Sequence, residues 1–248
     1  MKIYLAKNSG FCFGVRRAVE MAEACAAESG TVYTYGNIIH NESVIGELAD
    51  KGVHSVENLD SLHTGDTLII RAHGAPPSVY EQSEQKGIRL IDATCPYVKR
   101  IHKIVEQATQ EGNTVLIAGK ANHPEVIGIR GWAGGQAYVL EAESDVASLP
   151  EIGKAVLVAQ TTLPEETFYA IERAIQARFE NALQLQIRNT ICDTTRDRQK
   201  EAEEISRRST RMLVLGSKSS ANTQKLVEIC KKHCKNTENI DSIDKLLL

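Results

Sequence analysis

Three of the six cysteines occupy matching positions in the sequence, and their side chains are the strongest candidates for metal chemistry. Cys12, Cys95 and Cys192 each follow a strand-like segment and precede a helix-like segment, at intervals of 83 and 97 residues. The N-terminus of a helix favours an anion and lowers the pKa of a thiol. The repeated context therefore predicts three similar units that bring three thiolates to one centre.

Soft thiolates select zinc, copper(I) or iron–sulfur clusters. Structural zinc usually uses close C-x-x-C pairs, and the sequence contains none. A four-iron cluster normally takes four thiolates, so three cysteines would leave one iron open for a substrate. We therefore expect an iron–sulfur cluster with one open iron, held by Cys12, Cys95 and Cys192. The alternatives are cysteines that only fill the core and a zinc hydrolase with a Cys/His site.

Polar side chains gather where short apolar runs end. The runs at 68–74, 114–125, 155–164 and 211–222 are too short for helices and predict buried strands that end in turns. Ligands of open α/β sheets bind at the carboxyl ends of the strands. The candidates near such ends suit a phosphate or diphosphate, and they are His40, His73, His123, Thr161, Thr162, Ser219, Ser220 and Asn222. Glu125, two residues after His123, is the best candidate for a proton donor.

The remaining cysteines and histidines are expected to be structural or exposed, and they are Cys25, Cys230, Cys234, His54, His63, His102 and His233. Helix-like segments at 14–27 and 197–208 alternate with the apolar runs. Such alternation predicts parallel sheets with crossover helices. We place three similar α/β lobes at 13–95, 96–191 and 192–248, and we assign an N-terminal strand within 1–12 to the third lobe.

Composition excludes several classes of protein. Apolar residues make up 42% of the 248 residues and charged residues 25%, the balance of an ordinary globular protein. The net charge of −3 argues against a broad nucleic-acid surface. The sequence has neither an apolar stretch long enough for a membrane span nor a secretory signal, so a cytoplasmic protein is expected.

Eight motifs between residues 9 and 223 resemble those of the 4-hydroxy-3-methylbut-2-enyl diphosphate reductase family, also called IspH or LytB. They are SGFCFGVRRAVE, IIHNESV, AHGAPP, DATCPYVKRIH, ANHPEVIGIRGW, QTTL, TICDTTRDRQ and GSKSSANT. The resemblance covers nearly the whole chain. It implies an α/β protein of three lobes with mainly parallel sheets around a central 4Fe–4S cluster. It also implies an enzyme that catalyses the last step of the non-mevalonate isoprenoid pathway.

The resemblance also implies roles for individual residues. Cys12, Cys95 and Cys192 would hold the cluster, and Glu125 would supply protons. The substrate would be an allylic diphosphate, and the residues that contact it would be His40, His73, His123, Thr161, Ser220 and Asn222. Thr195 would lie beside the pocket. Reduced ferredoxin or flavodoxin would supply electrons, and the products would be isopentenyl and dimethylallyl diphosphate.

Two departures from the family pattern affect the diphosphate site. Ala221 stands where the family usually carries a residue with a hydroxyl group. The family also has a Gly-Ala-Ser segment with a further phosphate-binding serine, and the sequence up to Leu248 contains no match to it. The third lobe is therefore expected to be incomplete, and diphosphate binding to be weakened. A cluster-binding protein that has lost turnover is the alternative function.

Overall fold

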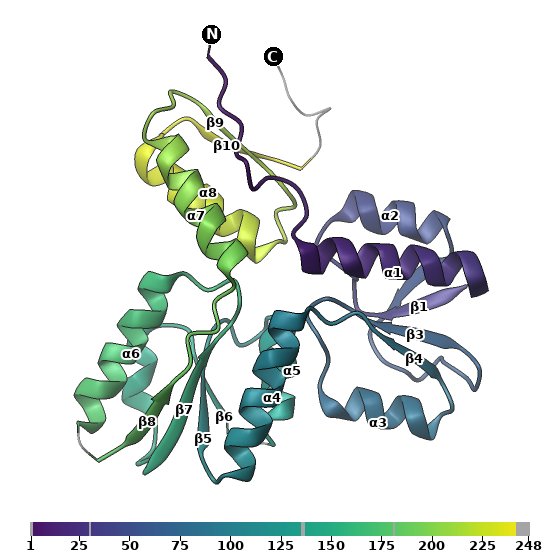
Figure 1. Ribbon diagram of the computed structural model, residues 1–248, viewed down its shortest axis with the longest axis horizontal. Coiled ribbons are helices and arrows are strands. Elements are labelled where there is room, and N and C mark those ends of the chain that lie inside the picture. The colour runs from purple at the N-terminus through teal and green to yellow at the C-terminus, as the bar shows by residue number, and fades with distance from the viewer. Residues whose placement is uncertain (1, 30, 135–136, 181, 242–248) are drawn as a thin grey trace.

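The computed structural model describes residues 2–29, 31–134, 137–180 and 182–241. Figure 1 shows three groups of helices and parallel strands that meet near the middle of the molecule. Within the described ranges, every helix is too short or too polar to span a bilayer. The α/β architecture with parallel sheets confirms the predicted fold class.

The first lobe is built on a four-stranded parallel sheet in the order β2-β1-β3-β4. Its strands are β1 (Val32–Tyr35), β2 (Val53–Val56), β3 (Thr67–Ile70) and β4 (Arg89–Asp92). Its helices are α1 (Phe13–Ser29), α2 (Glu42–Asp50) and α3 (Pro77–Gln85). All four residues of β3 are buried, because helices cover both faces of a parallel sheet.

The second lobe repeats this topology, with the strand order β6-β5-β7-β8. Its strands are β5 (Thr114–Ala118), β6 (Ala137–Leu140), β7 (Lys154–Ala159) and β8 (Gln184–Ile187). Its helices are α4 (Pro96–Gln110), α5 (Pro124–Trp132), the 3-10 helix η1 (Glu143–Ser148) and α6 (Glu165–Phe179). In both sheets the first strand lies between the second and the third, so each sheet has a switch point between its two central strands.

The third lobe contains α7 (Asp193–Ser206), β9 (Met212–Leu215), α8 (Ala221–His233) and β10 (Thr237–Ile240). Strands β9 and β10 pair in parallel. Each of the three sheets thus falls within one predicted lobe, and the lobe boundaries themselves remain a prediction. Residues 242–248, which the predicted third lobe includes, lie outside the described residues.

The predicted N-terminal strand is wrong for residues 2–12, which form no strand, while residue 1 lies outside the described residues. The backbone there bonds to side chains of α7 instead of a neighbouring strand. The Glu201 carboxylate accepts hydrogen bonds from the backbone N–H groups of Lys7 and Asn8, at 2.7 and 3.1 Å. Ile3 and Leu5 stay exposed.

Candidate active site

Four predicted substrate residues follow the central strands of the two large sheets. His40 comes after β1, and His73 comes after β3. In the second lobe, His123 comes after β5 and Thr161 after β7. These are the strands that flank the two switch points, where open α/β sheets bind their ligands. The repeated topology therefore explains why residues so far apart in the sequence come from equivalent places.

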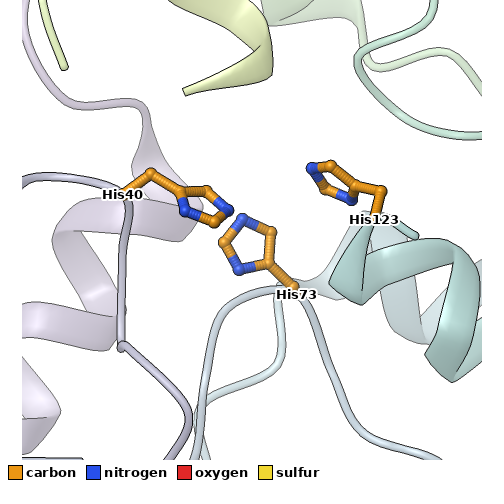
Figure 2. A group of neighbouring side chains, drawn as sticks. All are labelled: His40, His73 and His123. Carbon is orange, nitrogen blue, oxygen red and sulfur yellow. The ribbon is translucent and has the colours of Figure 1, made fainter. Parts of the chain in front are cut away.

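The three histidines come together at one point. Their ring centroids are 4.7 Å apart for His40 and His73, 5.5 Å for His73 and His123, and 5.9 Å for His40 and His123. Figure 2 shows the three side chains reaching toward one another from separate segments. One nitrogen of each ring lies within 4.8 Å of one nitrogen of the other two. We call these residues the histidine triad.

The triad is uncharged at neutral pH. Burial, followed by the positive charge of Arg71, lowers the pKa of His40. Burial also lowers the pKa of His73 well below its usual value, and it lowers the pKa of His123 to about 4. The nitrogens His40 Nε2 and His73 Nδ1 are buried and have no hydrogen-bond partner among the described residues. Because buried polar atoms normally have partners, these nitrogens indicate a site for a ligand.

An anion suits this site better than a metal ion. His123 is the N-cap of α5, and its Nδ1 accepts a hydrogen bond from the Glu125 N–H at 3.2 Å. The neutral ring therefore carries its proton on Nε2, where it can donate to an anion but cannot bind a metal. Arg71 and Lys120 also place positive charge near this ring. Both features favour a phosphate over a cation.

Glu125 and Thr161 form a buried pair next to the triad. The Thr161 N–H donates to Glu125 Oε1 at 2.6 Å, and the Thr161 hydroxyl donates to Oε2 at 2.7 Å. Only 2% of Glu125 is exposed. Burial raises the pKa of this carboxyl to about 7, against the opposing effect of the two hydrogen bonds. A carboxyl with a pKa near neutrality can both give and take a proton.

The three candidate metal ligands each lie immediately before a helix. Cys95 and Cys192 are the N-caps of α4 and α7, and the Cys12 carbonyl accepts the first hydrogen bond of α1 from Arg16. The Cys95 N–H donates to the Ala72 carbonyl, and the Cys192 N–H donates to the Thr161 carbonyl, each at 3.0 Å. Two cysteines are thereby fixed to the strand ends that carry His73 and Thr161.

Two expectations for these cysteines need correction. Cys12 follows no strand in residues 2–12, because that segment bonds to α7. The pKa of Cys95 is raised, since burial outweighs the hydrogen bonds from the backbone of Tyr97 and Val98 at the helix N-terminus. The helix position lowers this pKa as expected, but it is the smaller effect.

The donor set fits an iron–sulfur cluster. All three thiols are free and half-buried, and Cys12 and Cys192 are close enough to Cys95 to raise its pKa further. Three soft donors, each placed just before the first helix of a lobe, suit a shared multi-iron group, whose irons take separate thiolates. Gly14 lies against Cys95, because a Cβ atom there would come within 2.6 Å of the sulfur.

The predicted phosphate residues of the third lobe lie at the start of α8. Ser220 is the N-cap of α8, where its side chain accepts from the Thr223 N–H at 3.4 Å. Among the described residues, neither Ser220 nor Asn222 has a hydrogen bond to the triad or to Glu125. Thr195 is buried, and its N–H donates to the Cys192 carbonyl at 2.9 Å.

The residues expected to be structural or exposed largely fit that expectation. Cys25, Cys230 and Cys234 are buried. His102 stacks on Trp132 in the core, with ring centroids 5.4 Å apart, and its Nε2 has no partner.

Sequence reasoning missed two residues. Arg71 precedes His73 in the RAHGAPP motif, but its sequence position gave no sign of its electrostatic effect on all three histidines. Gln160 precedes Thr161, and its side-chain oxygen accepts from the Lys120 N–H at 3.1 Å. It thereby joins the ends of β5 and β7 beneath the site.

Comparisons with known proteins agree with this geometry. The chain is 44% identical over 252 residues to the 4-hydroxy-3-methylbut-2-enyl diphosphate reductase of Thermoanaerobacter sp., covering 100% of this chain and 86% of that protein. It is 43% identical over 250 residues to the reductase of the same name from Caldanaerobacter subterraneus, covering 99% and 86%.

Two solved structures are also similar. A structure of (E)-4-hydroxy-3-methyl-but-2-enyl diphosphate reductase aligns with a TM-score of 0.75 at 39% identity, covering 98% of this chain and 87% of that one. The E-1-hydroxy-2-methyl-but-2-enyl-4-diphosphate reductase of Plasmodium falciparum aligns with a TM-score of 0.89 at 31% identity, covering 96% and 76%.

The family model described as LytB protein matches residues 3–247, which is nearly the whole chain. This family is known to bind a 4Fe–4S cluster and to act on a small diphosphate substrate. The family model and the relatives match nearly the whole of this chain, and the solved structures share its fold. The chain therefore belongs to the LytB family.

Proposed function

We propose that this chain reduces 4-hydroxy-3-methylbut-2-enyl diphosphate to isopentenyl and dimethylallyl diphosphate, with loss of the allylic hydroxyl. The observation that carries the proposal is the buried Glu125–Thr161 pair beside three uncharged histidines. A protein that had kept only cluster binding would have no need for a buried carboxyl whose pKa lies near 7.

Cys12, Cys95 and Cys192 are proposed to hold the 4Fe–4S cluster and to leave one iron open. When bound, this cofactor supplies single electrons and a Lewis-acidic position for the substrate hydroxyl. The half-buried thiols and their links to the strand ends of His73 and Thr161 support this ligand set. The proposed electron donor is reduced ferredoxin or flavodoxin.

The substrate diphosphate is proposed to bind the histidine triad together with Ser220 and Asn222. His123 offers an N–H donor on Nε2. Because this buried ring is uncharged, it needs no ion pair with an acidic residue in the pocket. Ser220 stands at the start of α8, where free backbone N–H groups favour an anion.

The reaction consumes two electrons from the donor and two protons, one of which leaves with the hydroxyl as water while the other forms the new C–H bond. Glu125 is proposed to supply the proton that leaves with the hydroxyl. A hydroxide ion is a poor leaving group, and protonation in the transition state removes this barrier. The Thr161 N–H and hydroxyl hold both carboxylate oxygens in a fixed orientation. Thr161 is further proposed to help hold the substrate hydroxyl.

Single Cys→Ser variants test the proposed ligands. Each of Cys12→Ser, Cys95→Ser and Cys192→Ser, prepared without oxygen, should lose most of its iron and sulfide and all turnover. Cys25→Ser and Cys230→Ser are matched controls, since these buried thiols lie in helices α1 and α8. Full iron and sulfide in all three ligand variants would overturn the assignment, and bound zinc without sulfide would indicate a different metal site.

A further inference from the structure

Arg71 joins two of the loops that form the histidine triad. Tyr35 of β1 pairs with Ile70 of β3, so Gly36 and Arg71 follow directly on neighbouring strands. The guanidinium of Arg71 packs against Gly36 and lies over the Tyr35 ring, with its Cζ 5.6 Å from the centroid. Gly36 has φ +63° and no side chain, which leaves space for this contact.

The guanidinium has no bound acceptor among the described residues. It donates no hydrogen bond and forms no ion pair, and its Nε is buried without a partner. The Glu57 carboxylate is close enough to raise the pKa of Arg71, yet the two side chains form no ion pair. The side chain is half-buried, and its terminal nitrogens are not among the buried atoms that lack a partner, so the charge is available to a ligand in the pocket.

The pocket needs a source of positive charge. The three histidines are uncharged, and their neighbours include Arg71 for all three and Lys120 for His123. A diphosphate carries several negative charges, which uncharged donors alone balance poorly.

We propose that Arg71 is a positioning residue for diphosphate binding, which fixes the His40 loop beside His73 and supplies a permanent positive charge next to the triad. This inference rests on the proposed function for the identity of the substrate. Binding of the anion itself is a property of the pocket that can be measured separately.

Burial is the largest cause of the lowered pKa of all three histidines, and Arg71 is a smaller cause. The uncharged rings therefore do not replace the positive charge when Arg71 is removed. A variant that keeps this charge separates its effect on binding from a merely structural effect of the arginine.

Binding of inorganic pyrophosphate to the cluster-loaded protein tests the proposal by calorimetry. Arg71→Met should raise the dissociation constant about tenfold at pH 8, relative to wild type at the same pH. Arg71→Lys, which keeps the charge, should stay within about threefold of wild type. Arg173→Met on α6 is the charge-matched control and should bind like wild type.

Steady-state kinetics supply the second readout. Arg71→Met should raise the KM about tenfold and change kcat by less than about twofold, because the reacting atoms are untouched. If Arg71→Met does not fold, Gly36→Ala displaces the guanidinium while Arg71 stays in the sequence.

The outcomes separate the two proposals. Wild-type affinity in Arg71→Met, or a loss of affinity in Arg71→Lys as large as that in Arg71→Met, would overturn the role of Arg71. Pyrophosphate binding that depends on Arg71, in a protein that never turns over the allylic diphosphate, would overturn the proposed function alone.

Discussion

Glu125 is the residue whose environment differs most from that of an ordinary carboxyl. Its burial favours the neutral acid, while two hydrogen bonds from Thr161 favour the ion. The balance leaves the pKa at about 7, where both forms are populated at neutral pH. The neighbouring histidines respond to burial in the opposite sense, because burial disfavours their charged form. The site thus contains one weak acid and three neutral donors.

Replacement of this acid should affect turnover more than binding. Glu125→Gln keeps both hydrogen bonds to Thr161 possible, since its amide can accept one and donate the other. We expect kcat to fall by about 10²–10⁴-fold, the usual contribution of a general acid, with KM nearly unchanged. The alkaline limb of the kcat–pH profile near pH 7 should disappear. A kcat close to that of wild type would contradict the role of Glu125.

The same substitution should change the pH dependence of stability. The pKa of Glu125 is raised from 4.5 in the unfolded chain to about 7 in the fold, so its contribution is complete below pH 4.5 and is lost as the pH rises through 7. The loss is about 3 kcal/mol for a shift of this size. Thermal unfolding of both apoproteins between pH 4.5 and 8 should show wild type losing stability relative to Glu125→Gln. Parallel curves would exclude a buried acid with a raised pKa.

At the scale of elements, the sheets set the position of both ligands and substrate residues. The bonds from Cys95 to Ala72 and from Cys192 to Thr161 extend the β3–β4 and β7–β8 pairings beyond the strands. Each sheet therefore fixes a cysteine on one strand relative to a substrate residue on the next. Helix α1 completes the arrangement, because Gly14 allows it to approach Cys95.

A methyl group at Gly14 tests this close approach. Alanine favours a helix by about 1 kcal/mol over glycine, but its Cβ at position 14 would lie 2.6 Å from Cys95 Sγ. Gly14→Ala should therefore lower the iron and sulfide content of the purified protein. Gly46→Ala in α2 is the control, since its Cβ would meet nothing within 4 Å, and it should only stabilise the helix. Equal cluster content in both variants would show that the packing against Cys95 is unimportant.

The same elements show how far sequence reasoning could reach. The placement of His40, His73, His123 and Thr161 at strand ends was predictable, because parallel strands bring their carboxyl ends to one edge of a sheet. The position of the Arg71 guanidinium was not, since it packs against Gly36, which follows a different strand. The strand predicted within 1–12 failed because Glu201, almost 200 residues away, takes its backbone N–H groups. The roles of Ser220 and Asn222 stay predictions.

At the scale of the whole molecule, a few specific contacts join the three lobes. The Trp132 side chain of α5 donates to the Ala75 carbonyl in the first lobe at 2.9 Å. Arg198 of α7 donates to the Gly10 carbonyl, just before α1, at 2.7 Å and so joins the third lobe to the start of the first helix of the first lobe. A cluster held by the cysteines that precede α1, α4 and α7 would add a strong link between the three lobes.

Removal of this link should loosen the molecule as a whole. Ligands that bind only the folded state stabilise it, and a shared metal group couples the parts that hold it. Hydrogen exchange of the apoprotein should be faster at the starts of α1, α4 and α7 than in the cluster-loaded protein. Exchange in the buried strands β5 and β7 should change little. Uniform protection with and without iron and sulfide would argue against a cluster at the junction.

The most direct test is turnover by the wild-type chain. The protein, loaded with iron and sulfide in the absence of oxygen, is given 4-hydroxy-3-methylbut-2-enyl diphosphate and a strong one-electron reductant, and the products are separated by chromatography. We predict isopentenyl and dimethylallyl diphosphate, formed in a way that depends on Cys12, Cys95, Cys192 and Glu125. A fully loaded protein that returns the substrate unchanged would contradict the proposed reductase activity.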